Sequence, residues 1–290
     1  MRRRGIPLII IPGLVIALAL WLVLPPSLEE VDIPDSAEAI ARGQYLVHAG
    51  GCISCHQSPE GETDALSGGL ALESAFGTFY ASNLSPDPET GIGNWTGQDF
   101  IRAIKHGRNP NGAFYYPAFP YRAYAGFSDQ KVLDIAAYLL SQPAVKADTP
   151  EAEVPAWMAR WQISLWNRLD QLLQRKPELA QDPLIARGAW LARTAGHCGE
   201  CHTPRNRLGM TLSAQEFGGA ELGDDHVEAI DAEALEGWTE EDFALFLLLG
   251  LKADGEFVGG EMELVIEHNT SKLTDADRQA LAAFFIRGQR

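Results

Sequence analysis

All four cysteines of this 290-residue chain lie in two copies of one short motif. The copies are Cys52-Ile53-Ser54-Cys55-His56 and Cys198-Gly199-Glu200-Cys201-His202. The pattern Cys-x-x-Cys-His is typical of c-type haem attachment, because each thiol adds to one vinyl group of the porphyrin and the histidine binds the iron. We therefore predict two covalently bound haem c groups. They would be held by Cys52, Cys55, Cys198 and Cys201, with His56 and His202 as the proximal iron ligands.

Two other uses of paired cysteines fit this sequence less well. A zinc site made from both pairs would join motifs that begin 146 residues apart, each inside its own sequence repeat. A thioredoxin-like redox pair needs a βαβ pattern around it, and the sequence shows none. Covalent haem is the interpretation that accounts for both motifs.

The sixth iron ligand of an electron-carrying cytochrome c is usually methionine, which raises the reduction potential. The chain has four methionines. Met262 lies 60 residues after His202 in a glycine-containing segment that we read as a loop, and we predict that it binds the second iron. Met210 lies too near the attachment motif, and we interpret it as a packing residue.

The first half of the chain departs from this pattern. The repeat places Phe119 where Met262 would be matched, and a phenyl ring cannot bind iron. His106 and Met158 are the main candidates for the sixth ligand of the first iron, and an open coordination site is the third possibility. Weaker candidates near the expected site are His48, Tyr115, Tyr116 and Tyr121.

Matching segments indicate that the chain is duplicated. Residues 41–46 match residues 186–191 ahead of the two motifs, and Trp95 and Gly107 match Trp238 and Gly250 at an offset of 143. Thr96 with Asp99, Thr239 with Asp242, and Thr274 with Asp277 have the spacing of helix N-terminal capping boxes. Helices are expected to begin at Ser36 and at Pro183, and closing helices are expected over residues 128–141 and 274–287.

One further helix is expected between the halves, over residues 154–176. Its apolar residues share one stripe, which predicts a strut packed between domains or, as the lesser alternative, a helix that faces a quinone or a membrane. The stripe consists of Trp157, Met158, Trp161, Leu165, Leu169 and Leu172.

The N-terminus predicts a membrane anchor over residues 1–27. Residues 6–24 are almost wholly aliphatic and follow Arg2, Arg3 and Arg4, so they can nearly cross the bilayer while the N-terminus stays in the cytoplasm. A cleaved signal peptide is the alternative. The rest of the chain would then lie on the outer side of the membrane.

The net charge of −16 argues against binding to nucleic acid, whose phosphates would repel the chain. Residues 221–242 contain ten acidic residues and no lysine or arginine. This segment is either a solvated acidic loop or a docking surface for a basic redox protein, and in the second case association would slow as salt is added.

Several segments resemble the cytochrome c subunits of membrane-bound alcohol and sugar dehydrogenases. Residues 81–95 and 116–121 are similar to the first haem domain of those subunits, in which methionine usually stands at the position of Phe119. Residues 196–206 are similar to their second haem domain. Those subunits usually have three haem domains, whereas the repeat in this chain predicts two. The repeat and the resemblance together predict a mainly α chain of two tandem class I cytochrome c domains, residues 36–146 and 183–290, joined by a linker over residues 147–182. The resemblance also implies that Met262 is a sixth ligand.

These features together predict an electron carrier. The chain would be a dihaem cytochrome c of the bacterial inner membrane, with its haem domains in the periplasm and without catalytic residues of its own. Its partners would be a dehydrogenase, a basic soluble cytochrome or a respiratory complex. The alternative is a dihaem enzyme of the peroxidase or thiosulfate-oxidising type, with the first iron as an open site, because Phe119 replaces the expected methionine.

Overall fold

The chain is mainly helical, as predicted. The computed structural model describes residues 28–58, 66–174, 180–222, 225–252 and 255–289. The elements of the first half are α2 (Ala37–Ala49), α3 (Cys52–His56), β1 (Ala71–Ser74), β2 (Gly77–Tyr80), α4 (Gly97–His106), α5 (Tyr121–Tyr124) and α6 (Asp129–Leu140). Helix α7 (Gln162–Leu173) follows, between the halves.

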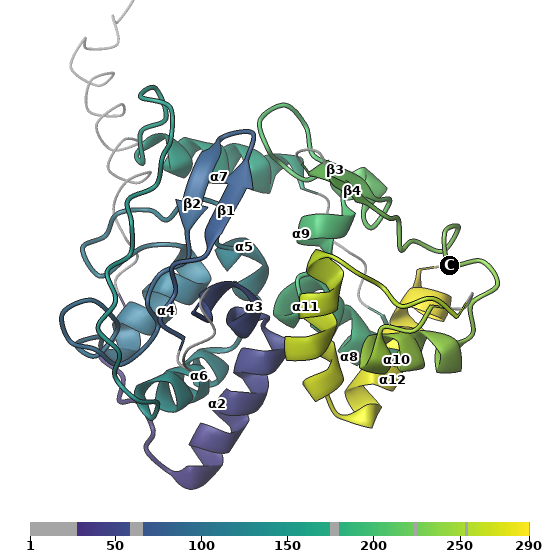
Figure 1. Ribbon diagram of the computed structural model, residues 1–290, viewed down its shortest axis with the longest axis horizontal. Helices are drawn as coiled ribbons and strands as arrows, with labels where there is room; N and C mark the ends of the chain where they lie inside the picture. Colours follow the sequence, from purple (N-terminus) through teal and green to yellow (C-terminus); the bar gives the residue numbers. More distant parts are fainter. Residues whose placement is uncertain (1–27, 59–65, 175–179, 223–224, 253–254, 290) are drawn as a thin grey trace, which may run out of the picture.

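The second half repeats this order of elements. Helix α8 (Pro183–Trp190) continues into a π-helical turn (Leu191–Ala195), and α12 (Asp275–Ala283) continues into another (Phe284–Gly288). Between them lie α9 (Gly199–His202), β3 (Ala220–Leu222), β4 (Asp225–Val227), α10 (Glu240–Leu249) and α11 (Glu261–His268), with 3₁₀ turns at Ser213–Gln215 and Thr270–Lys272. Figure 1 shows α2, α4 and α6 on the left and α8, α10 and α12 on the right.

The strands form two small antiparallel hairpins. β1 pairs with β2, with Ala71 opposite Tyr80, and β3 pairs with β4, with Ala220 opposite Val227. No helix in the described ranges is long and apolar enough to cross a membrane. The predicted anchor, residues 1–27, lies outside these ranges.

Local capping sets the helix starts at the predicted residues. The Thr96 hydroxyl accepts a hydrogen bond from the Asp99 amide, and the Asp99 carboxylate accepts one from the Thr96 amide, which completes a capping box. Thr239 and Thr274 also accept amide bonds from the residues three positions later. Helix α8 begins at Pro183, behind the capping side chain of Asp182.

Each half is held by one close crossing of its first and last helices. A Cβ atom on Gly43 of α2 would lie only 1.9 Å from the Asp134 carbonyl oxygen of α6, and a Cβ atom on Gly188 of α8 would lie 1.9 Å from the Ala280 carbonyl oxygen of α12. Only glycine therefore allows these backbones to approach. Arg42, next to the first glycine, binds the carboxylate of buried Asp134 through two hydrogen bonds of 2.8 and 2.9 Å.

The Arg42–Asp134 pair gives a stability prediction. Burial opposes ionisation of Asp134, but hydrogen bonds from Arg42 and Gln130 outweigh it and hold the pKa below its ordinary value of 3.8. The pair therefore stabilises the fold above pH 3.8, and this stabilisation is lost as the pH falls through the lower, folded-state pKa. Asp134→Asn should reduce the free energy of unfolding at pH 7 by roughly 1.5–3 kcal/mol, the range for hydrogen bonds to charged groups.

Denaturant titration followed by circular dichroism at pH 7 and pH 3 measures this effect. The difference in the free energy of unfolding between wild type and Asp134→Asn should be smaller at pH 3 than at pH 7. Asp129→Asn is the matched control, because Asp129 lies on the same helix and pairs with Lys105 at the surface, with its side chain 59% exposed, where an ion pair adds little stability. Equal stability of the two variants at pH 7 would contradict the prediction.

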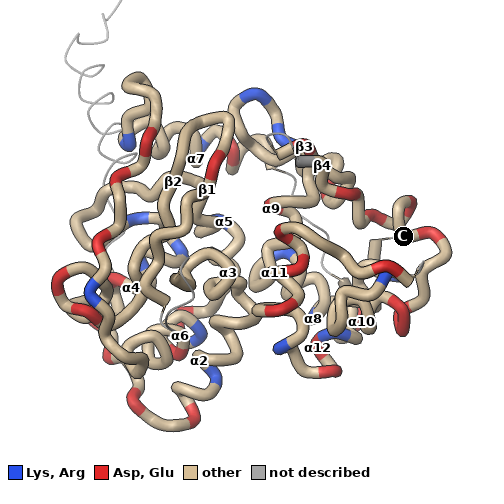
Figure 2. The backbone as a smooth tube through the Cα atoms, in the orientation of Figure 1, with Lys and Arg blue, Asp and Glu red and all other residues tan. Residues whose placement is uncertain are grey.

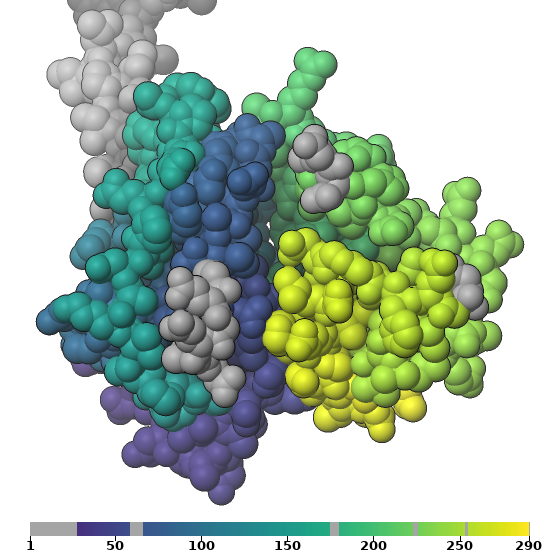
Figure 3. Space-filling view, in the orientation of Figure 1, coloured from purple at the N-terminus to yellow at the C-terminus, as the bar shows by residue number. Residues whose placement is uncertain are grey.

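The two halves contact each other along a continuous seam, where the purple and blue first half meets the yellow C-terminal segment in Figure 3. Two residues at equivalent positions of the repeats, one from each half, make contacts across this seam. Tyr45 of α2 donates its hydroxyl to the Asp277 carboxylate of α12 at 2.5 Å. Trp190, its counterpart on α8, packs edge-on against Phe127 before α6, with ring centroids 5.6 Å apart. Each half therefore reaches the start of the other half's closing helix.

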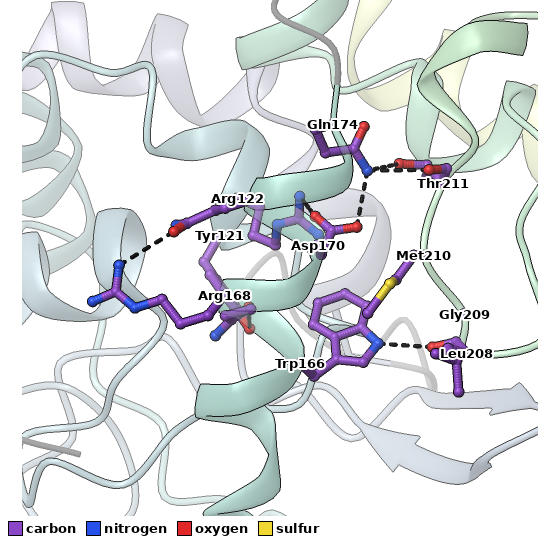
Figure 4. A network of polar contacts seen from close by, with 12 residues as sticks. Tyr121, Arg122, Trp166, Arg168, Asp170, Gln174, Leu208, Gly209, Met210 and Thr211 are labelled. Atoms are coloured by element: carbon purple, nitrogen blue, oxygen red, sulfur yellow. Dashed lines mark hydrogen bonds and ion pairs between the residues drawn. The ribbon is translucent and has the colours of Figure 1, made fainter. Parts of the chain in front are cut away.

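Helix α7 also joins the halves, but not through the predicted face. Its inner side is polar, as Figure 4 shows: Asp170 pairs with Arg122 of the first half, and the Trp166 indole donates to the Leu208 carbonyl of the second half at 2.7 Å. The side chain of Gln174 donates to Thr211 at 3.1 Å. The prediction that the apolar stripe packs between domains is wrong for most of its residues, since they face outward. The exposed members are Trp157, Trp161, Leu165, Leu169 and Leu172.

Candidate haem-attachment sites

Each cysteine motif forms a short helix that directs its two thiols to one side. Cys52 and Cys55 are the first and fourth residues of α3, and Cys198 and Cys201 have the same relation at the start of α9. Residues three positions apart share a helix face, so each pair can reach two points on one edge of a porphyrin. All four thiols are free of disulfide bonds.

The histidine of each motif is fixed by a backbone carbonyl. The Nδ1–H of His56 donates to the Ser82 carbonyl at 2.7 Å, and the Nδ1–H of His202 donates to the Glu228 carbonyl at 2.7 Å. A proton on Nδ1 leaves the lone pair of Nε2 available for iron, and such an outer hydrogen bond orients a metal-binding imidazole. Both acceptors lie 26 residues after their histidine. Neither acceptor was predicted from the sequence, although both lie at this same spacing.

Partial burial favours the neutral forms of the motif histidines and cysteines. Burial lowers the pKa of His56 and His202, and the hydrogen bonds to Ser82 and Glu228 oppose this only in part. Neutral imidazole is the form that binds iron. Burial raises the pKa of Cys52 and Cys198 to about 12, so these thiols are not reactive thiolates. Their environment therefore does not favour a redox-active thiol pair.

A zinc site has no support in the described part of the chain. Within those residues, no three histidine, cysteine, aspartate or glutamate side chains are grouped so that they could hold a metal ion. The four ligands of a structural zinc site would have to meet at one point. The geometry instead provides one histidine and two thiols at each of two places, and these residues fit haem c.

The two motifs begin next to each other. A Cβ atom on Gly51, just before Cys52, would lie 3.4 Å from Nε2 of His197, just before Cys198. His197 has φ 39°, a left-handed conformation that a residue with a side chain seldom adopts, whereas Gly51 has φ 67° at the matching position. The ring of Tyr124 packs edge-on against His197 at 5.3 Å, and its hydroxyl donates to the Gly50 carbonyl. These contacts of His197 were not predicted from the sequence.

Phe119 sits in an aromatic cluster at the place where the repeat would have a methionine. Its ring centroid lies 5.6 Å from that of Tyr115, 5.7 Å from that of Tyr124 and 6.2 Å from that of Tyr121. The Tyr121 hydroxyl donates to Asn167 at 2.9 Å, and burial raises its pKa to about 12. Tyr121 is therefore neutral and already engaged, which makes it a poor iron ligand.

The two main candidates for the missing ligand lie in different surroundings. His106 ends α4, where burial and the charge of Lys105 lower its pKa. Met158 lies beside the segment that carries Phe119, because the Tyr116 hydroxyl donates to the Met158 carbonyl at 3.3 Å. Arg160, two residues later, donates to the Phe114 carbonyl at 2.8 Å. The structure thus brings Met158, from outside the first repeat, to the loop that lacks methionine.

Met262 lies on a helix and not in the loop that was predicted. Helix α11 begins at Glu261, after Gly260 with φ 65°, so Met262 is in the first turn and half-buried. Burial is the main cause that raises the pKa of both Cys55 and Cys201, and the charge of Glu261 adds to it, which places this turn near both motifs. Met210 is only 2% exposed, in agreement with its interpretation as a packing residue.

Comparison with known proteins gives consistent matches. Residues 40–143 match the family model described as cytochrome c. The chain is 37% identical over 296 residues to a diheme cytochrome c-type protein of Cereibacter sphaeroides, covering 99% of this chain and 98% of that one. It is 33% identical to the gluconate 2-dehydrogenase cytochrome c subunit of Pantoea cypripedii and 34% identical to the cytochrome c subunit of a quinone alcohol dehydrogenase of Gluconobacter oxydans.

The dehydrogenase subunits are longer than this chain. The matches cover 84% and 86% of the chain but only 58% and 55% of those two subunits. The chain thus spans little more than half of the length of these relatives, whereas it spans nearly all of the diheme relative.

Proposed function

The chain belongs to the cytochrome c family, and from this premise we propose that it is a dihaem electron carrier anchored to the outer face of a cytoplasmic membrane. The observation that carries the proposal is the matched pair of histidines, each with Nδ1 bound to a carbonyl and Nε2 left for iron. Membership of the cytochrome c family supports the presence of haem c. Two haems, their positions and the membrane location are the parts that we propose.

Residues 36–146 and 183–290 would each form one haem domain. Cys52, Cys55 and His56 would hold the first haem, and their counterparts Cys198, Cys201 and His202 would hold the second. The iron supplies one-electron exchange, while the chain fixes the imidazoles, buries the attachment edge and sets the ligands that tune the potential. No other side-chain chemistry is required for electron transfer.

We assign Met262 to the second iron and Met158 to the first. Met262 is supported by its place in the repeat, opposite Phe119. Met158 is supported by its contact with the loop around Tyr116. His106 also adjoins that loop, because the Tyr115 amide donates to the carbonyl of neighbouring Gly107 at 2.7 Å, so it is the second candidate. With methionine on both irons the chain would have no open site for substrate, which favours a carrier over an enzyme.

The dihaem enzyme remains the second candidate because Phe119 stands in the place of methionine. A peroxidase or thiosulfate-oxidising reaction would need one iron with an open or weakly held position. Binding of carbon monoxide to the reduced protein distinguishes the two functions. The carrier should bind none at neutral pH, and rapid binding to one iron per chain would favour the enzyme.

The membrane location rests on the N-terminal sequence. Residues 6–24 and the three preceding arginines support an inner-membrane anchor with both haem domains in the periplasm. The relatives named as subunits of gluconate and alcohol dehydrogenases support a dehydrogenase as electron donor. Electrons would then pass to a soluble cytochrome or a respiratory complex.

The acidic second half provides a test of electron delivery. Exposed Glu233 and Glu236 belong to the acidic segment, and Figure 2 shows acidic colouring spread over the right-hand part of the molecule. We expect the reduced chain to transfer electrons to lysine-rich mitochondrial cytochrome c, and neutralising both residues to glutamine should slow the reaction several-fold at low ionic strength. At high salt the wild type and the variant should converge, since a Debye length of about 8 Å at 0.15 M salt weakens steering.

Stopped-flow absorbance measures this reaction. A matched control neutralises Glu38 and Glu151, two exposed acids of the first half and the linker, and should leave the rate nearly unchanged. No electron transfer under any condition would refute the carrier function. Equal slowing by both double variants would refute only the docking surface.

A further inference from the structure

The exposed side of α7 carries a continuous apolar strip. Trp161, Leu165, Leu169 and Leu172 recur at helical spacing, and Trp157 extends the strip into the preceding turn. Their exposed fractions are 64% for Trp161, 57% for Leu165, 39% for Leu169, 83% for Leu172 and 67% for Trp157. Single exposed apolar residues are ordinary, but a strip of this length on one helix marks an interaction surface.

The strip faces outward because the opposite face is fixed. Ile163, Ser164 and Asp170 are buried on that side, and Asp170 is fully buried and paired with Arg122. Figure 4 shows the same side joined to the second half through Trp166 and Gln174. Rotating α7 to bury the strip would expose this network and break its contacts, so the strip is a stable feature of the surface.

The charge along the strip differs in sign from the net charge of the chain. Between residues 154 and 174 the only acidic residue is Asp170, which is buried, while Arg160 is exposed. Arg207 and Leu208, from the loop against which Trp166 packs, are also exposed and extend the surface with one more cation and one more apolar side chain. Exposed Glu151 and Glu153 precede the strip, so the segment with exposed arginine and no exposed acid begins at residue 154, in a chain whose net charge is −16.

We propose that this face, which we call the α7 face, lies on the lipid surface of the membrane. Tryptophan and leucine facing outward with flanking arginine are the composition of helices that lie in a bilayer interface. A basic redox partner would instead be attracted to the acidic surfaces. The inference rests on the proposed anchor, residues 1–27, which would keep the rest of the chain at high effective concentration near lipid and so make weak contact sufficient.

The consequence is a fixed orientation of the carrier. Helix α7 contacts both halves, and it runs across the top of the molecule in Figure 1. With the α7 face on the lipid, both attachment motifs would take a set height above the membrane, and the acidic surface of the second half would remain open to soluble partners.

Spin labelling of the full haem-loaded chain in phosphatidylcholine–phosphatidylglycerol vesicles tests the proposal. Cysteine would be introduced singly at Leu165 and at Leu172, with Leu249 as the matched control, an exposed leucine on α10 with 51% exposure. The four native cysteines would be consumed by haem, so only the new thiol takes the label, and haem content per chain checks that attachment is intact.

Collision with oxygen, which partitions into lipid, is compared with collision with a water-soluble nickel chelate. Labels at positions 165 and 172 should collide with oxygen several-fold more often than with the chelate. The label at position 249 should collide more often with the chelate. Equal behaviour at all three positions would overturn the proposal. Magnetic coupling between labels of two chains would also overturn it, because a second copy would then cover the α7 face.

Flotation of the vesicles distinguishes failure of the anchor from failure of the α7 face. If the chain does not float with lipid, both the anchor and the α7 face are refuted. If it floats while the labels at positions 165 and 172 stay open to the chelate, the α7 face is refuted and the anchor stands.

Discussion

Serine at both Cys52 and Cys55 is expected to leave one covalent haem per chain instead of two. The same change at Cys198 and Cys201 should remove the other haem and spare the first. Each motif has its own pair of thiols on its own short helix, so neither pair can replace the other. The effect is large because thioether bonds, and not affinity alone, retain haem c.

Haem per chain is measured by pyridine haemochrome absorbance after extraction with acidified acetone, and the mass of the intact chain gives an independent count. Ser54→Ala is the control, because it changes α3 without removing a thiol. Retention of two haems by either double variant would contradict the assignment, as would complete loss of haem from the wild type on extraction.

Alanine at Met262 is expected to remove half of the weak red absorption band that ferric iron shows when methionine sulfur binds it. Alanine at Met158 should remove the other half, and the double variant should lack the band. The reduction potential of the affected iron should fall in each case, within the ~0.8 V range over which axial ligands set haem potentials. The physical reason is that thioether sulfur favours ferrous iron.

Met210→Leu is the control for these measurements, because Met210 is buried and should not bind iron. If the band disappears entirely in Met262→Ala, the first iron has no methionine and the assignment of Met158 is wrong. His106→Ala would then decide the ligand: a low-spin spectrum that becomes high-spin would identify His106, and an unchanged high-spin spectrum with carbon monoxide binding would indicate an open site.

Features determined by nearby residues were predictable from the sequence. The cysteine motifs, the capping threonines and the helix start at Pro183 depend on contacts within a few residues, and the structure has them where the pattern placed them. The loop predicted at Met262 failed for a local reason as well. Gly259 and Gly260 suggest irregular structure, but a positive φ at Gly260 is compatible with a helix that begins at the next residue.

Features that depend on distant residues were not predictable. An apolar stripe on an isolated helix is normally turned inward, yet α7 turns its polar side inward because Arg122 and Thr211, far away in the sequence, provide partners for Asp170 and Gln174. The contacts of Met158 with Tyr116 and of His197 with Gly51 also join residues that are distant in the sequence. Spacing alone contains no information on which loops meet.

The reciprocal use of Tyr45 and Trp190 makes the seam between the halves isologous in form, as in a twofold symmetric dimer. In a dimer of separate subunits such a contact dissociates on dilution, and the distance between the two redox centres is lost with it. Here one polypeptide carries both sides of the contact, so its occupancy does not depend on protein concentration. The two attachment motifs therefore remain neighbours even when the protein is scarce.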